Sequence, residues 1–236
     1  MPHVNERKDA VALSYFASRR AVGWIALLLP FALAIPVAIR LHVLESSISG
    51  YYYTGARTLF VGSLCAISMF MLSARGYDRR DEIAGMLSAL FALGVAFFPT
   101  APDGCEELRK TSSAYASCFK ELQQSCGSGV HYTFAALLFS TLAFFCLVLF
   151  KMTRPDGEMT PQKKQRNVVY TVCGWVIVAS MALIFTASKI LHIQYLVWEG
   201  LQPTLLFEST ALIAFGTAWL VKGEFVLKDA NDAASK

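Results

Sequence analysis

Six long apolar runs restrict what this chain can fold into. They cover approximately residues 21–39, 58–74, 83–100, 130–150, 168–188 and 203–221. Each has the roughly 17–25 residues that a helix needs to cross a hydrocarbon core of about 30 Å. In lipid the backbone polar groups must be satisfied within the segment, so such runs cross as helices. The sequence therefore predicts an all-α polytopic membrane protein, a bundle of six transmembrane helices.

Composition agrees with a membrane-embedded domain. Hydrophobic residues make up 55% of the 236 residues and charged residues 16%, and the mean hydropathy is +0.47. Soluble domains carry about a quarter charged residues. We therefore divide the chain into a cytoplasmic N-terminal segment (1–20), a transmembrane domain (21–222) and a cytoplasmic tail (223–236). No basic helix with interleaved aromatic residues is present, so nucleic acid is not an expected partner.

The distribution of Lys and Arg predicts how the chain is oriented. With the N-terminus inside, the inner segments contain 15 of these residues and the outer segments contain 6. Cytoplasmic loops of membrane proteins carry such an excess. The sequence therefore predicts a multi-pass protein of a cell membrane, expected to be a bacterial inner membrane, with both the N and C termini in the cytoplasm.

The longest connection between runs, residues 101–129, is predicted to lie outside the cell. It contains Cys105, Cys118 and Cys126, and an oxidising compartment permits a disulfide there. Because three is an odd number, we expect one bridge, of Cys105 with either Cys118 or Cys126, and one remaining thiol. One apolar stripe in this loop has helical spacing and predicts a short amphipathic helix, formed by Tyr115, Cys118, Phe119, Leu122 and Cys126.

Polar and aromatic side chains gather at the outer ends of the predicted helices. The stretch SISGYYYTGAR between the first two runs contributes three tyrosines and an arginine, His131 begins the fourth run, and Glu208 lies inside the sixth. A pocket lined by these side chains would face outward and would accept a membrane lipid headgroup or a small amphiphilic ligand. The candidate ligand-binding residues are Tyr51, Tyr52, Tyr53, Arg57, His131 and Glu208.

Glu208 is the candidate that most needs a partner. It lies beyond Pro203, about 7–8 Å along a helix, where an ionised carboxylate is costly unless it is paired. Arg57, at the outer start of the second run, is the most economical partner. We therefore expect Arg57 and Glu208 to share one buried network, with tyrosine hydroxyls and His131 close by.

Three histidines at a similar depth permit a second interpretation. Catalytic zinc often takes three protein ligands and a water molecule, so His42, His131 and His192 would suit a membrane-embedded, metal-dependent lipid hydrolase or transferase. No H-x-x-x-H or H-E-x-x-H spacing supports such a site. A proton- or ion-coupled transporter is a third interpretation, but it would require several embedded acids, and only Glu208 is embedded.

No motif specifies a reaction. The sequence contains no nucleophile elbow, phosphate loop or dinucleotide fingerprint. It therefore assigns no cofactor, no catalytic residue and no oligomeric state, and it leaves open whether the protein is an enzyme.

Four blocks of the sequence resemble a known family. These blocks, between about residues 45 and 225, are ISGYYYTGARTLFVGSLCA, RGYDRRDEIAGMLSALFALGVAFFPT, HYTFAALLFSTLAFFCLVLF and FESTALIAFGTAWLVKGE. They resemble an uncharacterised group of bacterial six-span membrane proteins that is broadly similar to the DRAM/Frag-like proteins. The resemblance implies a six-helix bundle, with Tyr51–Tyr53, Arg57, His131 and Glu208 in the matching blocks. It implies no particular reaction.

Overall fold

The computed structural model describes residues 2–42, 44–73, 79–100, 128–152, 160–187 and 202–227. The predicted disulfide, the predicted amphipathic helix of the 101–129 loop and His192 lie outside the described residues. Every regular element inside the described ranges is helical. In chain order the elements are α1 (Pro2–Leu41), η1 (Ser49–Tyr53), α2 (Arg57–Ser73), α3 (Arg79–Phe97), α6 (Ser128–Leu147), η2 (Leu149–Lys151), α7 (Pro161–Phe185) and α8 (Pro203–Lys222).

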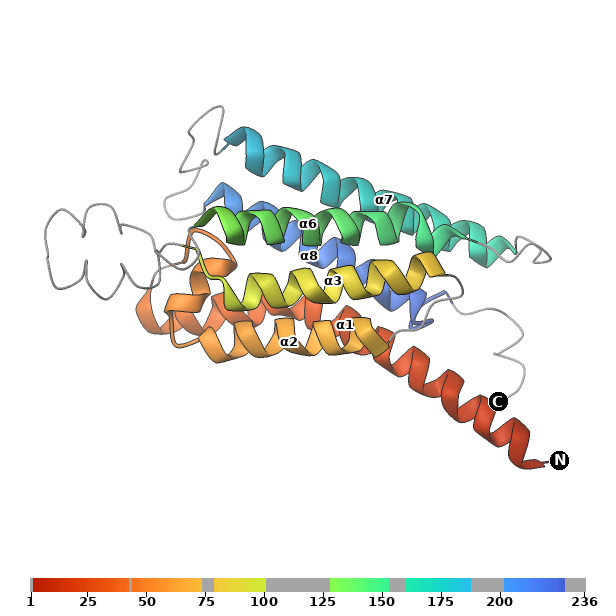
Figure 1. Ribbon diagram of the computed structural model, residues 1–236. Helices are drawn as coiled ribbons and strands as arrows, with labels where there is room; N and C mark the ends of the chain where they lie inside the picture. The colour runs from red at the N-terminus through yellow and green to blue at the C-terminus, as the bar shows by residue number, and fades with distance from the viewer. Residues whose placement is uncertain are drawn as a thin grey trace, which may run out of the picture.

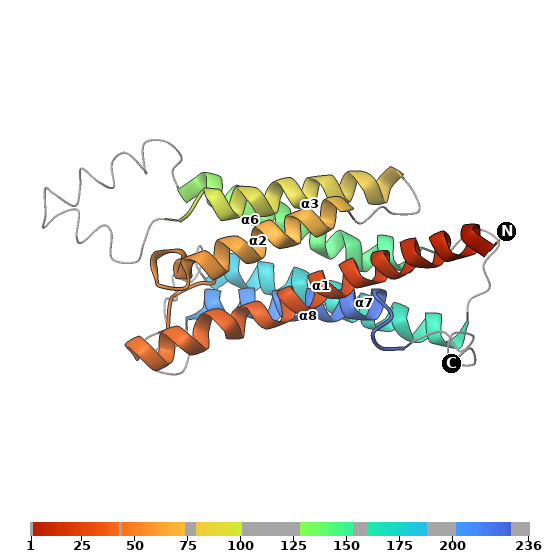
Figure 2. The same cartoon turned by 90° about the horizontal axis from the view of Figure 1, so that it is seen from below.

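The six long helices of the described ranges lie side by side (Figure 1), and their contacts form a closed ring. Each helix packs against the next one along the chain, and α8 returns to pack against α1, which closes the ring. α8 also contacts α6 across the ring. The view turned by 90° shows the same neighbours, with α1 beside α8 and α2 beside α3 (Figure 2).

Four of the helical segments are long and apolar enough to cross a membrane. They are Phe16–Leu41, Gly129–Lys151, Pro161–Phe185 and Pro203–Lys222. α2 is apolar but shorter, and α3 begins with the charged residues RRDE. The prediction of an all-helical protein with helices of membrane-crossing length is therefore confirmed.

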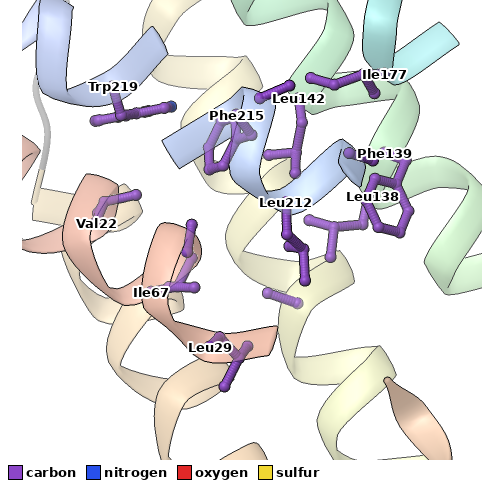
Figure 3. Packing of buried hydrophobic residues seen from close by; sticks show 14 of the residues in the cluster. Val22, Leu29, Ile67, Leu138, Phe139, Leu142, Ile177, Leu212, Phe215 and Trp219 are labelled. Atoms are coloured by element: carbon purple, nitrogen blue, oxygen red, sulfur yellow. The ribbon is translucent and has the colours of Figure 1, made fainter. Parts of the chain in front are cut away.

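Apolar side chains occupy both the inside and the outside of the bundle. The interior is packed with large side chains from α1, α2, α6, α7 and α8 (Figure 3), among them Leu29, Ile67, Phe139, Ile177 and Phe215. On the outside, Met69, Val168 and Trp175 are 61–65% exposed. Soluble proteins rarely expose contiguous apolar surface, whereas lipid is as apolar as these side chains, so the outer surface agrees with residence in a membrane.

The bundle has two ends. The η1 end carries residues 44–57, the last turn of α3 and the first turns of α6 and α8. The Trp219 end is the opposite one, and it carries residues 16–24, 149–152, 160–170 and 219–227.

Candidate functional site at the η1 end

The segment between α1 and α2 is attached to the start of α8 by two hydrogen bonds. The backbone N–H of Leu205 donates to the carbonyl of Ser46 at 3.0 Å. The backbone N–H of Ile48 donates to Oε2 of Glu208 at 2.7 Å. Ile48 is the residue before η1, so its N–H has no partner within a helix. The carboxylate of Glu208 therefore has a backbone donor.

The predicted pair between Arg57 and Glu208 is wrong. Arg57 is the first residue of α2 and is exposed; its guanidinium donates to the hydroxyl of Tyr52 and lies 4.2 Å from the centre of that ring. The carboxylate of Glu208 instead accepts a hydrogen bond from the backbone N–H of Ile48. The physical reason is that an arginine at an exposed helix end keeps its charge solvated while it stacks on an aromatic ring. It therefore has no need of a buried acid.

The three tyrosines of η1 do not line a common space. A 3₁₀ helix has three residues per turn, so consecutive side chains point in three directions. Tyr51 is fully buried, whereas the Tyr52 ring meets Arg57 and lies edge-to-face against the Tyr53 ring at 5.3 Å. The hydroxyl of Tyr53 donates to the carbonyl of Thr100, just after α3.

The hydroxyl of Tyr51 is buried, and within the described ranges it makes no hydrogen bond of ordinary geometry. Burial raises the pKa of this hydroxyl above its usual value; the neighbouring Glu45 backbone lowers it in part, and the Glu45 carboxylate raises it further. Tyr51 therefore stays neutral at physiological pH. It places an O–H group, able both to donate and to accept, beside the acidic side chain of Glu45.

His131 connects the start of α6 to the end of α3. Its ring is 2% exposed, and Nδ1 donates to the carbonyl of Phe98 at 2.7 Å. His42 lies apart from it, exposed at the end of α1. Among the described residues no three potential ligands gather around a metal position. For His131 the structure thus gives a positioning role between two helices.

The η1 end therefore contains two polar clusters rather than one network. The first joins Glu208 to the Ser46–Gly50 segment, where the hydroxyls of Ser47 and Ser49 lie 3.1 Å apart. The second joins Tyr53 and His131 to the backbone that follows α3. The Ile48 donor was not predictable from the sequence, since a backbone N–H carries no side-chain signal.

The first cluster is rich in hydrogen-bond acceptors. An ionised carboxylate offers about four acceptor positions, and in the described part of the chain Glu208 uses one of them. The serine hydroxyls and the Glu45 carboxylate lie on the same short segment. This arrangement suits a ligand that donates hydrogen bonds or carries a positive charge.

Comparison with known proteins gives no match. No protein-family model fits the chain, and no curated protein or solved structure is similar to it. The resemblance to the DRAM/Frag-like proteins stays a prediction.

The observed contacts change what a double-mutant cycle should measure. Arg57→Met and Glu208→Leu should be additive in the free energy of unfolding to within about 0.3–0.5 kcal/mol, because the two side chains have separate partners. Arg57→Met and Tyr52→Leu should couple by about 0.5–1 kcal/mol, because leucine removes the ring that the guanidinium contacts, as expected for an exposed cation–π contact. Unfolding in mixed detergent micelles gives both values. A larger coupling for Arg57 with Glu208 than with Tyr52 would contradict these contacts.

Proposed function

We propose that the protein is a six-span membrane protein, with both termini cytoplasmic, whose η1 end binds the headgroup of a lipid or of a small amphiphile. The ring arrangement supports six spans, because α2 and α3 lie between helices of membrane-crossing length and pack against them. The excess of Lys and Arg on the segments at the opposite end supports the orientation.

The carboxylate of Glu208 is the main observation in favour of headgroup binding at the η1 end. It lies within the second turn of α8, is only partly exposed and, in the described part of the chain, receives one hydrogen bond, from the N–H of Ile48. An acid at membrane depth is a functional-site hypothesis by default because of its cost in lipid. A headgroup ammonium or hydroxyl would supply the remaining donors to Glu208 and to the adjacent serine hydroxyls.

The surroundings of the η1 end support an amphiphile rather than a fully polar ligand. Large apolar side chains are exposed on the last turns of α1 and α3, at the same end of the bundle as the acceptor cluster; they are Ile39, Leu41 and Phe97. These surfaces would contact an acyl or alkyl chain while the headgroup reaches Glu208. The exposed Arg57 and Tyr52 offer a second, cationic contact at the rim for a phosphate group.

Glu208→Gln should lower the lipid retained by the purified protein about tenfold, because a hydrogen bond to a charged group is worth about one factor of ten in affinity. The measurement is native mass spectrometry of the full chain in mild detergent, with ethanolamine and choline phospholipids as probes. Glu82→Gln is the matched control, since Glu82 is an exposed acid in the first turn of α3, at the other end of the bundle. Equal retention by the wild type and both variants would refute the proposed site.

A further inference from the structure

The acceptor cluster at the η1 end combines carboxylates with hydroxyls, those of Glu45, Glu208, Ser47 and Ser49. They lie on or against the segment that leads into η1. Oε2 of Glu45 is 3.3 Å, and Oγ of Ser47 3.5 Å, from the position that a Cβ on Gly50 would occupy. Oε2 of Glu208 accepts from the backbone N–H of Ile48 at 2.7 Å. Two carboxylates thus meet the same short segment.

The cluster has more acceptor positions than donors to fill them. The oxygens of Ser47 and Ser49 lie 3.1 Å apart, so one hydroxyl donates to the other, and Oγ of Ser47 also accepts from the N–H of Gly50 at 3.0 Å. Glu208 is partly exposed and, within the described ranges, receives a single hydrogen bond and forms no ion pair. An ionised carboxylate has about four acceptor positions. Most of those on Glu208 are therefore available to a ligand.

Tyr51 adds a buried polar group beside this cluster. Its side chain is fully buried, and its hydroxyl makes no hydrogen bond of ordinary geometry within the described part of the chain. Burial raises the pKa of the hydroxyl, the Glu45 backbone lowers it in part, and the Glu45 carboxylate raises it further, which places the hydroxyl near Glu45. Because a neutral phenol can donate to a carboxylate, Tyr51 is placed to hold Glu45 where a ligand would meet it.

The aromatic rings of η1 do not suit a quaternary ammonium group. Such a group has no N–H and is bound through the faces of aromatic rings. Tyr51 is buried, and the guanidinium of Arg57 already lies 4.2 Å from the centre of the Tyr52 ring. The Tyr53 ring lies edge-to-face against Tyr52. The segment η1 therefore forms no open aromatic cage, and its neighbouring oxygens favour a ligand with N–H donors.

We propose that the acceptor cluster selects a primary ammonium group over a quaternary one, as in an ethanolamine headgroup or a free amine. This inference rests on the proposed function of the η1 end and names its ligand class. A primary ammonium is a compact charge with three donors. Glu208 would accept a charge-assisted hydrogen bond from it, and Glu45 and Ser47 would accept the others. Each N-methyl group removes one donor and keeps the charge, so it leaves an acceptor of the cluster unpaired.

The test uses the wild-type full chain and lipids that differ only at the headgroup nitrogen. They are phosphatidylethanolamine, its N-methyl and N,N-dimethyl derivatives, and phosphatidylcholine, all with the same acyl chains. The delipidated protein in a neutral detergent is titrated with each lipid, and separately with free ethanolamine, and binding is measured by native mass spectrometry. Affinity should fall along the series, by at least about tenfold from the first lipid to the last.

The outcomes separate this selectivity from the headgroup site itself. Equal affinity for all four lipids, lowered in each by Glu208→Gln, would overturn the selectivity and leave the headgroup site standing. Affinities that Glu208→Gln does not change would remove the headgroup site, and the inference with it. Binding of free ethanolamine that is lost in Glu208→Gln would support the ammonium site and assign it to a soluble amine. If Glu208→Gln fails to fold, the wild-type series decides the selectivity alone.

Two glycines of the same connection test whether Glu45 takes part. Gly50→Ala puts a Cβ 3.3 Å from Oε2 of Glu45, so this side chain must shift, whereas a Cβ at Gly55 meets nothing within 4 Å. Gly50→Ala should lower the ratio of the affinities for phosphatidylethanolamine and phosphatidylcholine at least about threefold, and Gly55→Ala should not change it. An unchanged ratio in Gly50→Ala would exclude Glu45 from the site.

Tyr51→Phe tests the positioning role of the buried hydroxyl. It should lower the same affinity ratio, while the thermal midpoint of the lipid-free protein stays the same or rises, because the change removes an unsatisfied buried hydroxyl. A lower midpoint with an unchanged ratio would show that Tyr51 is structural and would overturn its role in selectivity.

Discussion

Replacement of Trp219 by alanine is expected to lower the free energy of unfolding by about 3–5 kcal/mol. The indole is 1% exposed, and its ring lies 5.4–5.8 Å from those of Phe145, Phe150 and Phe215. The Trp219 side chain therefore packs α8 against α6 and η2. Lipid is as apolar as these neighbours, so the loss comes mainly from the empty volume and the missing packing contacts rather than from transfer out of water.

Trp175 on α7 is the matched control for this prediction. It is 61% exposed on the outside of the bundle, so Trp175→Ala should cost less than about 1 kcal/mol. Trp219→Phe should recover more than half of the loss, because it keeps an aromatic ring in the cluster. Unfolding of each variant by a denaturing detergent in mixed micelles gives the comparison. Equal losses for the two alanine variants would show that the aromatic cluster does not hold the helices together.

The helices were largely predictable, because an apolar run long enough to cross a membrane has few alternatives to a helix. The sixth run was expected over 203–221 and α8 spans Pro203–Lys222, with Pro203 at its first position, where the missing N–H costs nothing. α1 is the exception, since it begins at Pro2 whereas its apolar run begins near residue 21. Hydrophobicity marks the part of a helix that meets lipid and does not mark where the helix itself begins.

The partners within the η1 end were not predictable from side-chain types. Glu208 was matched with Arg57 on the basis of charge, but the N–H of Ile48 reaches it because the Ser46–Gly50 segment folds back over α8. The YYY triplet suggested three rings around one space, yet in the 3₁₀ turn Tyr51 is buried while the Tyr52 and Tyr53 rings contact each other. Both outcomes depend on the path of a short connecting segment, which leaves no periodic pattern in the sequence.

The buried position of Arg166 was hidden for a different reason. In the sequence, Arg166 counts among the charges that connect the fourth and fifth apolar runs and signal orientation. In the helix, Arg166, Tyr170 and Cys173 lie four and three residues apart and are all buried on one face. By its charge, Arg166 was assigned to a connecting loop. Because α7 begins at Pro161, Arg166 instead lies within the helix, and its side chain is buried.

Gly216→Ala is expected to cost about 1–3 kcal/mol, and Gly216→Val more, because the backbone of α1 packs directly against α8 at this residue. A Cβ at Gly216 would lie 2.7 Å from the carbonyl oxygen of Gly23 and 2.7 Å from the amide nitrogen of Leu27. Both are backbone atoms of α1, so a rotamer change cannot relieve the contact and the two helices must separate. Small residues at helix interfaces allow such close packing in lipid.

Gly62 on α2 provides the control for this last prediction. A Cβ there would meet nothing within 4 Å, so Gly62→Ala should be neutral or should stabilise by up to about 1 kcal/mol through its better helix propensity. Unfolding in mixed micelles measures both variants, and a cysteine crosslink engineered between α1 and α8 reports whether the helices have moved apart. If Gly216→Ala were as stable as Gly62→Ala, the close contact between α1 and α8 could not be what closes the ring.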